Sequence, residues 1–273
     1  MTSPPRLLVL LCVLIACAPA YSQDPNSLPD SPSHARESAG EPPQSPTNRR
    51  VTWRSLPKAV LQDQKAIWWL FPSQLARGQH LLPTLAIAGG TAGLITGDSH
   101  AMPYFQSHAQ NLDDINDVFD PLITSAEVIL VPASLMVAGY VRHDDYQVDT
   151  ALLAGEAYAD SAVVDLAIKA VTRRKRPSDV APTGQFDDTF FAGGKSPFKG
   201  SSFPSGHAAG AFAVATVIAT RYHTHRWVPW AAYGFATAIS LSRISSSAHF
   251  PSDVFLGAAL GYTITRYQVL RPR

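Results

Sequence analysis

The sequence contains few of the residues that support disulfide bonding, thiol chemistry or nucleic-acid binding. Only two of its 273 residues are cysteines, and both, Cys12 and Cys17, lie near the N-terminus. The rest of the chain therefore has no internal disulfide, no cysteine nucleophile and no thiolate metal site. Charged residues make up 16% of the chain, and the formal net charge is +1 with histidine neutral. This balance excludes a strongly basic surface for nucleic acid.

The N-terminus has the pattern of an export signal. A positive residue precedes an apolar run at 7–16, and small residues follow as far as Ala20. This order is typical of a secretory signal peptide, so we assign residues 1–20 to a signal and expect export to the bacterial cell envelope or periplasm. The run that ends at Cys17 also resembles a lipobox, in which that cysteine is lipidated. Cleavage after Ala20 and lipidation of Cys17 stay open as alternatives.

The signal is followed by a polar segment and then by a helical region. Residues 21–52 are rich in proline, serine, asparagine and charge, with almost no large apolar side chains. Such a composition cannot offset the entropy of ordering, so it predicts a disordered tether. We assign residues 53–273 to one helical domain, whose first part, 53–79, suits an amphipathic helix. For Trp68 and Trp69, packing in the core is favoured over a position at a membrane interface.

Six apolar segments in this domain have more helix formers than strand-like alternation. They are residues 81–98, 121–141, 150–172, 205–221, 227–242 and 253–268. The fold class they predict is all-α, a helical bundle of about six core helices. Residues 178–202 are rich in glycine and proline and predict a long ordered loop.

The segments do not settle whether the chain crosses a membrane. A span needs about 20 predominantly apolar residues, and several of these runs are shorter. Segment 150–172 also contains Glu156, Asp160 and Asp165. Because Asp165 points away from Glu156 on a helix, one inward face cannot hide all three carboxylates. A soluble or peripheral protein and an integral membrane protein therefore both stay open, with membrane association expected.

The first of three chemically suggestive motifs is KAVTRRKRP at 169–177. Lys169 and Arg176 are seven residues apart, so on a helix they project from nearly the same side, about 10 Å apart along the axis. Pro177 discourages continuation of the helix through Arg176. Two cations in this arrangement can hold two sides of an anion. For the intervening basic residues at 173–175 a solvated helix end or contact with lipid headgroups is favoured over contact with substrate.

The second motif, SSFPSGHAAG at 201–210, predicts the start of a helix. Pro204 suits a first helical turn, which leaves the following backbone N–H groups as free donors at the positive end of the helix dipole. Gly206 lets a ligand approach the main chain, and Ser205 supplies a hydroxyl. His207 supplies an acid whose unperturbed pKa of about 6.5 suits proton transfer near neutrality.

The third motif, SRISSSAHFPSD at 242–253, pairs a histidine with a carboxylate. His249 and Asp253 are four residues apart across Pro251, a predicted helix start. The carboxylate can therefore reach one ring nitrogen and leave the other facing outward as a nucleophile. Arg243 ends the preceding apolar helix and brings a further cation suited to phosphate oxygens. Together the three motifs predict a phosphate site that needs no metal.

These motifs resemble the signature of the type 2 phosphatidic acid phosphatase superfamily, which includes acid phosphatases and vanadium-dependent haloperoxidases. The signature has three parts, K-x6-R-P, P-S-G-H and S-R-x5-H-x3-D, and the sequence matches them in order and at every fixed position. The resemblance implies a helical bundle in which His249 attacks phosphorus and Asp253 orients it. It implies that His207 protonates the leaving oxygen and then activates water. The residues implied to hold the phosphoryl oxygens are Lys169, Arg176, Ser205, Gly206 and Arg243.

The predicted activity is metal-independent hydrolysis of a phosphate monoester or diphosphate through a phosphohistidine, with vanadate as an inhibitor. A lipid-linked substrate such as phosphatidic acid, phosphatidylglycerol phosphate or an isoprenoid diphosphate is favoured, because export and apolar segments place the chain near a membrane. A soluble periplasmic acid phosphatase acting on a small phosphate ester is one alternative. A haloperoxidase with vanadate as its cofactor is another. A non-enzymatic binding protein is disfavoured because every catalytic position is present.

Two other groups of polar residues receive no functional role. Four aspartates lack the spacing of an EF-hand loop, so they predict a solvated acidic turn: Asp113, Asp114, Asp117 and Asp120. Four scattered histidines lack metal-ligand spacing: His80, His100, His108 and His143.

Overall fold

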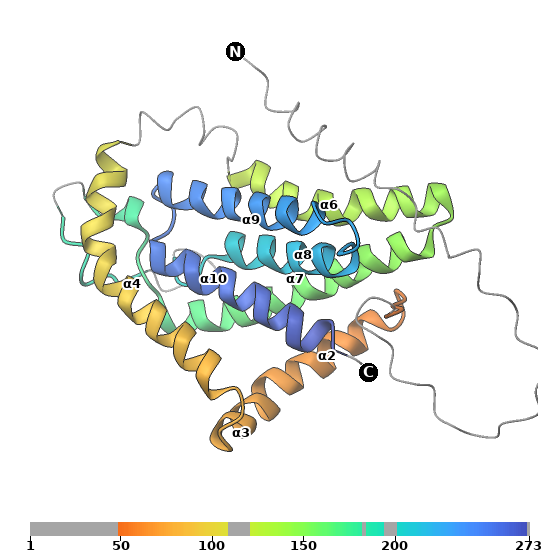
Figure 1. Cartoon of the computed structure of the whole chain (residues 1–273). Coiled ribbons are helices and arrows are strands. Elements are labelled where there is room, and N and C mark those ends of the chain that lie inside the picture. Colours follow the sequence, from red (N-terminus) through yellow and green to blue (C-terminus); the bar gives the residue numbers. More distant parts are fainter. Residues whose placement is uncertain (1–48, 109–120, 182–183, 194–200, 272–273) are drawn as a thin grey trace, which may run out of the picture.

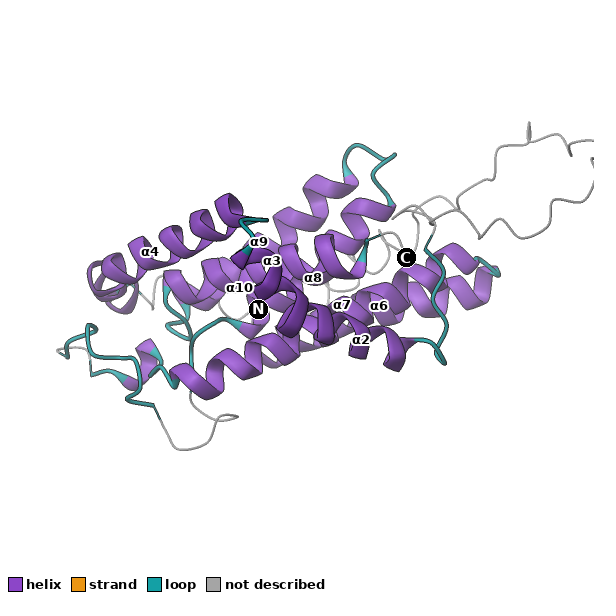
Figure 2. Cartoon of the chain, turned by 90° about the horizontal axis from the view of Figure 1, so that it is seen from below, coloured by secondary structure: helices purple, strands orange, loops and turns teal. Residues whose placement is uncertain are grey.

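The computed structural model describes residues 49–108, 121–181, 184–193 and 201–271. These ranges contain helices and loops but no strand, as Figure 2 shows. The predicted signal, most of the predicted tether and the four aspartates at 113–120 lie outside the described residues. The prediction of an all-α fold is confirmed.

Each of the six apolar segments corresponds to a helix. In chain order the elements are α2 (Leu56–Lys65), the π-helix η1 (Ala66–Leu70), α3 (Phe71–Ala76), α4 (Leu81–Ser107), α6 (Pro121–Arg142), α7 (Asp145–Thr172), the 3-10 helix η3 (Pro177–Asp179), α8 (Gly206–Arg221), α9 (Val228–Ser245), α10 (Pro251–Ile264) and the π-helix η4 (Thr265–Val269). Within the described ranges, no helix combines the length and the apolar composition needed to cross a membrane.

Helix α8 is the centre of the bundle, with α7, α9 and α10 packed around it (Figure 1). Most of its side chains are small and buried, which lets its neighbours approach its backbone closely. Two glycines of α10 make the closest approach. A methyl group at Gly257 would overlap the carbonyl oxygen of Ser205, and one at Gly261 would overlap that of Ala209. The side chains of α10 are therefore held at a fixed position relative to the start of α8.

The helix ends that carry the three motifs meet at one end of the bundle. Helix α7 ends at Thr172, where Arg173 adopts a left-handed conformation with φ 40°. Helix α8 begins after its N-cap Ser205, whose side chain accepts a hydrogen bond from the Ala208 N–H. Helix α10 begins at Pro251 as predicted, and the Asp253 carboxylate caps it. We call this region the motif end.

Two local predictions about these termini are wrong. The helix stops before Pro177 as predicted, but the helical spacing predicted for Lys169 and Arg176 is wrong, because α7 has already ended and Arg176 has extended dihedrals of −76° and 152°. Pro204 lies before the N-cap of α8 rather than in its first turn. Arg173, with φ 40°, ends α7 before Arg176, and Ser205, with extended dihedrals of −82° and 110°, delays the start of α8 until after Pro204.

The expected burial of two groups of side chains is also wrong. Glu156, Asp160 and Asp165 are all buried. More than one face of α7 is covered, because α2, α6 and α8 all pack on it. In contrast, Trp69 is 76% exposed and Trp68 is 40% exposed, so the indole rings do not pack in the core.

Candidate active site

Contacts between the motifs bring their residues into one site at the motif end. The backbone N–H of Ser205 donates to the Asp253 carbonyl oxygen over 2.9 Å, which joins the second motif to the third. A Cβ atom at Gly206 would lie 3.2 Å from the Lys169 ammonium nitrogen, so the first motif reaches the start of α8. The rings of His207 and His249 have centroids 6.4 Å apart.

His249 is buried and held by a backbone carbonyl. Its Nδ1 lies 2.8 Å from the carbonyl oxygen of Ser202 and 3.6 Å from Oδ2 of Asp253. Because a carbonyl only accepts, Nδ1 carries the proton and donates it, and the neutral ring keeps its lone pair on Nε2. The predicted orienting partner was Asp253, whereas the nearest acceptor is Ser202. Asp253 acts on the ring as a nearby charge.

The electrostatic surroundings favour a neutral imidazole at His249. Burial lowers its pKa, and the Asp253 carboxylate opposes this effect. The positive charges of Lys169 and Arg176 lower the pKa further. A neutral histidine in a cationic site is suited to attack on a phosphate group, because it needs no prior loss of a proton from Nε2.

The Asp253 carboxylate is fixed by two donors and is fully buried. Its Oδ2 accepts from the Phe250 N–H over 2.8 Å, and its Oδ1 lies 2.7 Å from Nη1 of Arg174. The same nitrogen of Arg174 donates to the Ser252 hydroxyl over 2.7 Å. The carboxylate therefore cannot rotate without breaking contacts that also define the start of α10.

Arg174 and Asp98 were not predicted as site residues. Arg174 is 1% exposed, so the expectation of a solvated helix end is wrong for this residue. Its Nη2 lies 2.7 Å from Oδ2 of Asp98 on α4, its Nε donates to the Thr189 hydroxyl over 3.0 Å, and its guanidinium lies 3.8 Å from the ring centroid of Phe250. A lone aspartate within a mainly apolar segment was the available signal for Asp98.

The predicted cations differ in how they are held. The Lys169 ammonium lies 2.6 Å from Oδ2 of Asp165, four residues earlier on α7. The Arg243 side chain is fully buried and donates to the Ser242 hydroxyl over 3.1 Å and 3.2 Å. The Arg243 carbonyl oxygen accepts from the N–H of His249 over 3.1 Å. Arg176 is partly exposed, so it lies toward the solvent side of the site.

Burial raises the pKa of Asp165, while Lys169 and, to a lesser extent, His249 oppose that effect. Its second oxygen, Oδ1, accepts no hydrogen bond from the described residues. From the sequence, Asp165 was interpreted only as a charged residue within an apolar helix. It was not assigned to the predicted phosphate site.

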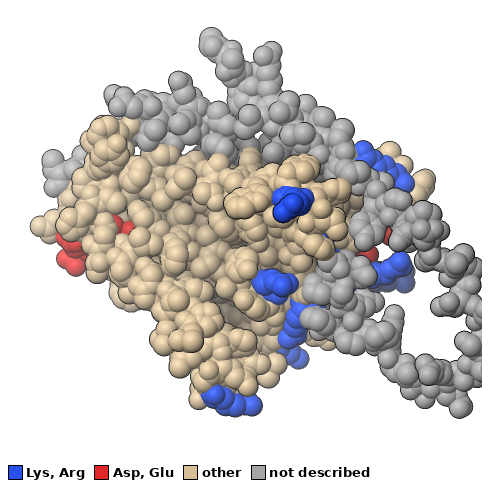
Figure 3. All heavy atoms as spheres, in the orientation of Figure 1, with Lys and Arg blue, Asp and Glu red and all other residues tan. Residues whose placement is uncertain are grey.

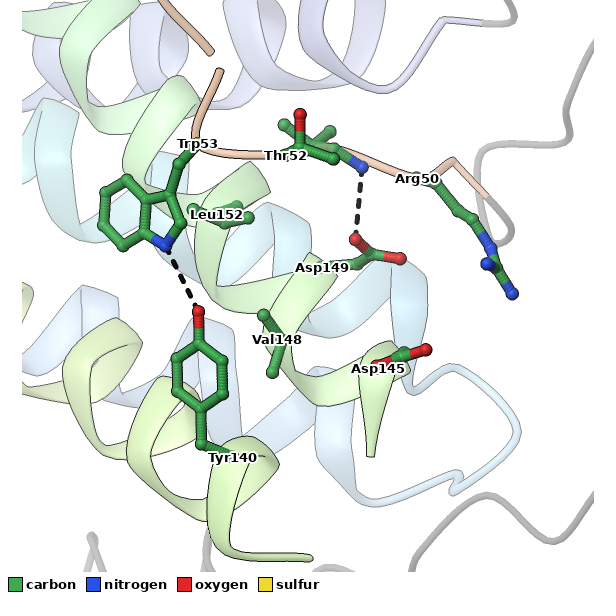
Figure 4. A pocket seen from close by; sticks show the side chains of 9 residues that line it. Arg50, Thr52, Trp53, Tyr140, Asp145, Val148, Asp149 and Leu152 are labelled. Atoms are coloured by element: carbon green, nitrogen blue, oxygen red, sulfur yellow. Dashed lines mark hydrogen bonds between the residues drawn. The ribbon is translucent and has the colours of Figure 1, made fainter. Parts of the chain in front are cut away.

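Two other polar regions lie apart from these residues. One is a pocket lined by residues 50–53, Tyr140 and the first turns of α7, where Trp53 donates to Tyr140 over 3.2 Å (Figure 4). The other is a buried group of carboxylates, Asp63, Glu156 and Asp160, whose oxygens lie within 4.8 Å of one another. Nη2 of Arg49 lies 2.8 Å from Oε1 of Glu156, so one of these carboxylates forms a buried ion pair.

Comparisons with known proteins agree with the motifs. The family model described as the PAP2 superfamily matches residues 150–271, which contain all three motifs. The curated lipid A 1-phosphatase of Porphyromonas gingivalis is 42% identical over 65 residues, a match that spans 23% of this chain and 15% of that protein. A transmembrane PAP2-type phosphatidylglycerolphosphate phosphatase from Bacillus subtilis aligns with a TM-score of 0.39 and 18% identity, covering 78% of this chain and 92% of that one. Residues 150–271 are therefore similar in sequence to the PAP2 superfamily.

Proposed function

We propose that this chain is an exported phosphatase that hydrolyses a phosphate monoester or diphosphate carried by a lipid. The observation that carries the proposal is the position of His249. Its Nδ1 is bound to a carbonyl oxygen, and Lys169, Gly206 and His207 lie at the same end of the bundle. A neutral nucleophile beside several phosphate-binding groups is the minimum that phosphoryl transfer through histidine requires.

In the first step Nε2 of His249 attacks phosphorus, a P–N bond forms, and the bond to the leaving oxygen breaks. His207 donates a proton to that oxygen. In the second step His207 accepts a proton from water, the water oxygen attacks phosphorus, and the P–N bond breaks to release inorganic phosphate. Asp253 stabilises the positive charge that the imidazole carries between the two steps.

The phosphoryl oxygens would be held by fixed charges and backbone donors. Lys169, Arg176 and Arg243 supply the positive charge, and the first turn of α8 supplies N–H groups next to Ser205 and Gly206. These groups favour the transition state because its charge is spread over the same oxygens. No metal has a role in this sequence of steps, and vanadate should inhibit as a trigonal-bipyramidal mimic of the transition state.

Exposed apolar side chains favour a lipid substrate. The face in Figure 3 has few charged side chains. Where η1 leads through α3 into α4, Trp69 is 76% exposed, Leu70 53% and Leu82 81%. From residue 64 to residue 97 the sequence contains no acidic residue and two basic ones, Lys65 and Arg77. We call residues 66–85 the apolar corner and propose that it contacts an anionic membrane surface.

The first experiment measures phosphate release by the purified mature chain. The substrates are phosphatidic acid, phosphatidylglycerol phosphate, lipid A 1-phosphate, undecaprenyl diphosphate and a soluble aryl phosphate, with His249→Ala as the control. Rapid turnover of one lipid, inhibited by vanadate, supports the proposal. Turnover of the soluble ester alone would replace it with a periplasmic acid phosphatase. Vanadate-dependent bromination without phosphate release would replace it with a haloperoxidase.

A further inference from the structure

A buried aspartate connects α4 to the residues around His249. Asp98 is 1% exposed, and few residues of α4 are buried at all. Its Oδ2 lies 2.7 Å from Nη2 of Arg174. Its Oδ1 accepts from the Ser252 N–H over 3.1 Å, and Oδ2 also accepts from the Ser252 hydroxyl. Asp98 therefore contacts both the arginine that holds Asp253 and the residue that precedes Asp253.

The Arg174 guanidinium lies between two carboxylates. The distances are 2.7 Å to Asp98 and 2.7 Å to Asp253. The Phe250 ring, 3.8 Å from the guanidinium carbon, packs against its plane. A planar fork of donors can bind two carboxylates at once, whereas an ammonium group has no such geometry. The orientation of Asp253 therefore depends on the group that fixes the other side of Arg174.

The three charges have a consequence for the reaction. Arg174 alone would cancel the charge of the carboxylate that faces His249. Burial raises the pKa of Asp98, and its contacts with Ser252 and Arg174 oppose that effect. With Asp98 ionised, the two carboxylates and one guanidinium carry a net charge of −1 beside the imidazole. Attack by Nε2 makes the imidazole cationic, because Nδ1 keeps its proton. A net negative neighbour stabilises that cation in the transition state more than the neutral ring in the ground state.

We propose that Asp98 is a positioning residue for His249 and Asp253, acting through Arg174, and that it maintains the net negative charge beside the imidazole. Its effect on turnover rests on the proposed function. Its effect on the protonation of His249 can be measured without any substrate.

Charged and titratable residues on several elements surround His249. They are Asp165 and Lys169 on α7, Arg176 after α7, His207 on α8, Arg243 on α9 and Asp253 on α10. Asp98→Asn leaves all of them unchanged and removes one negative charge while keeping the shape of the side chain. The charged imidazole then loses a stabilising neighbour, so the pKa of His249 should fall below its wild-type value.

The experiment is a proton titration of His249 by nitrogen NMR in the mature protein with labelled histidine. His249→Gln assigns the signal, and Asp149→Asn, which changes a carboxylate outside the motif end, is the matched control. We expect a lower His249 pKa in Asp98→Asn and an unchanged one in Asp149→Asn. In parallel, kcat/KM should fall about tenfold or more in Asp98→Asn, and the acid limb of its pH profile should move to lower pH.

An unchanged His249 pKa in Asp98→Asn would overturn the inference, even if activity were lost. Absence of phosphate release by the wild type would instead overturn the proposed function, and the titration would still decide the role of Asp98.

If Asp98→Asn does not fold, Arg174→Lys provides the second test. It keeps the positive charge but not the fork, so kcat/KM should fall about tenfold. Wild-type kcat/KM in a folded Arg174→Lys protein would contradict the inference.

Discussion

Both ends of the bundle bury an arginine, and the partners of the two arginines differ. At the motif end, the 1% exposed Arg174 lies between the carboxylates of Asp98 and Asp253. At the opposite end, Arg221 is 2% exposed at the C-terminus of α8. Similar burial therefore accompanies two different electrostatic environments.

All the hydrogen-bond acceptors of Arg221 are neutral. It donates to the Thr150 hydroxyl over 2.7 Å and to the carbonyl oxygens of Arg49 and Tyr146 over 3.1 Å and 3.2 Å. Its guanidinium lies 3.9 Å from the Tyr146 ring centroid, and burial lowers its pKa. Arg221 therefore satisfies a hydroxyl and two backbone carbonyl oxygens at its end of the bundle. Arg174, which lies between two carboxylates, instead contributes to the charge around His249.

The opposite end also attaches residues 49–53 to the bundle. The Val51 N–H donates to Asp149 over 3.1 Å, and the Trp53 indole donates to Tyr140 over 3.2 Å (Figure 4). The comparison therefore predicts that changes at the motif end reduce catalysis, while changes at the Arg221 end reduce stability.

The largest effect should follow from His249→Gln. Loss of the proposed nucleophile should lower kcat by at least about 1,000-fold, because the proposed covalent route is removed. Its matched control is His223→Gln beyond the end of α8, where the ring is exposed and contacts the Thr220 carbonyl over 2.9 Å. Phosphate release by both variants checks this prediction. A similar loss in the two variants would contradict the separation of the two ends.

A pair of glycines in α10 tests how sharply activity depends on position. Gly257→Ala forces a methyl group against the Ser205 carbonyl at the site, whereas Gly261→Ala forces one against Ala209, a turn farther along α8. Each change should destabilise the fold by about 1–3 kcal/mol through overpacking. Only Gly257→Ala should also lower kcat/KM, by about tenfold or more. Urea unfolding and phosphate release measure the two quantities, and equal activity losses would contradict the prediction.

Arg221→Met should affect stability without affecting turnover. The substitution removes three hydrogen bonds to buried acceptors and should lower the free energy of unfolding by about 2–4 kcal/mol. At a temperature where the variant is folded, kcat/KM should equal the wild-type value. Urea unfolding and phosphate release check both statements. A tenfold loss of kcat/KM in the folded variant would show that the Arg221 end contributes to catalysis.

The sequence predicted those parts of the molecule that depend on local pattern. The six apolar segments became helices, and Pro251 marks the start of α10. The environment of Arg174 could not be predicted, because its partner Asp98 is 76 residues away and a basic run at a helix end looks the same whether solvated or buried. The acceptor for His249 was missed because it is a backbone carbonyl, which residue types do not reveal.

Burial of charge was also beyond the sequence pattern. A helical periodicity assigns faces, but it does not say how many neighbouring helices cover them. Helix α7 is covered by α2, α6 and α8, so Glu156, Asp160 and Asp165 are all buried despite facing different directions. Trp69 shows the opposite error, since it was expected in the core and is exposed. An aromatic side chain is buried only where another part of the chain packs against it.

The smallest predicted effect concerns Asp165, the carboxylate that pairs with Lys169 over 2.6 Å. Burial raises the pKa of Asp165, and Lys169, His249 and Asp253 are the charged groups that act on it. Above that pKa the carboxylate is ionised, so it competes with phosphate for Lys169 and repels the phosphate oxygens. Below it the carboxyl is neutral and neither effect operates. Asp165→Asn should therefore bind phosphate about fivefold more tightly than the wild type at high pH.

The pH dependence separates this electrostatic effect from a change of shape. As pH falls through the pKa of Asp165, the wild type gains a proton and comes to resemble Asp165→Asn in charge. The ratio of the two inhibition constants for inorganic phosphate should then approach one. Competitive inhibition measured at several pH values checks this, with Asp149→Asn as a carboxylate control outside the motif end. A ratio that stays constant with pH would mean that Asp165 affects phosphate only by its packing against Lys169 and Gly206.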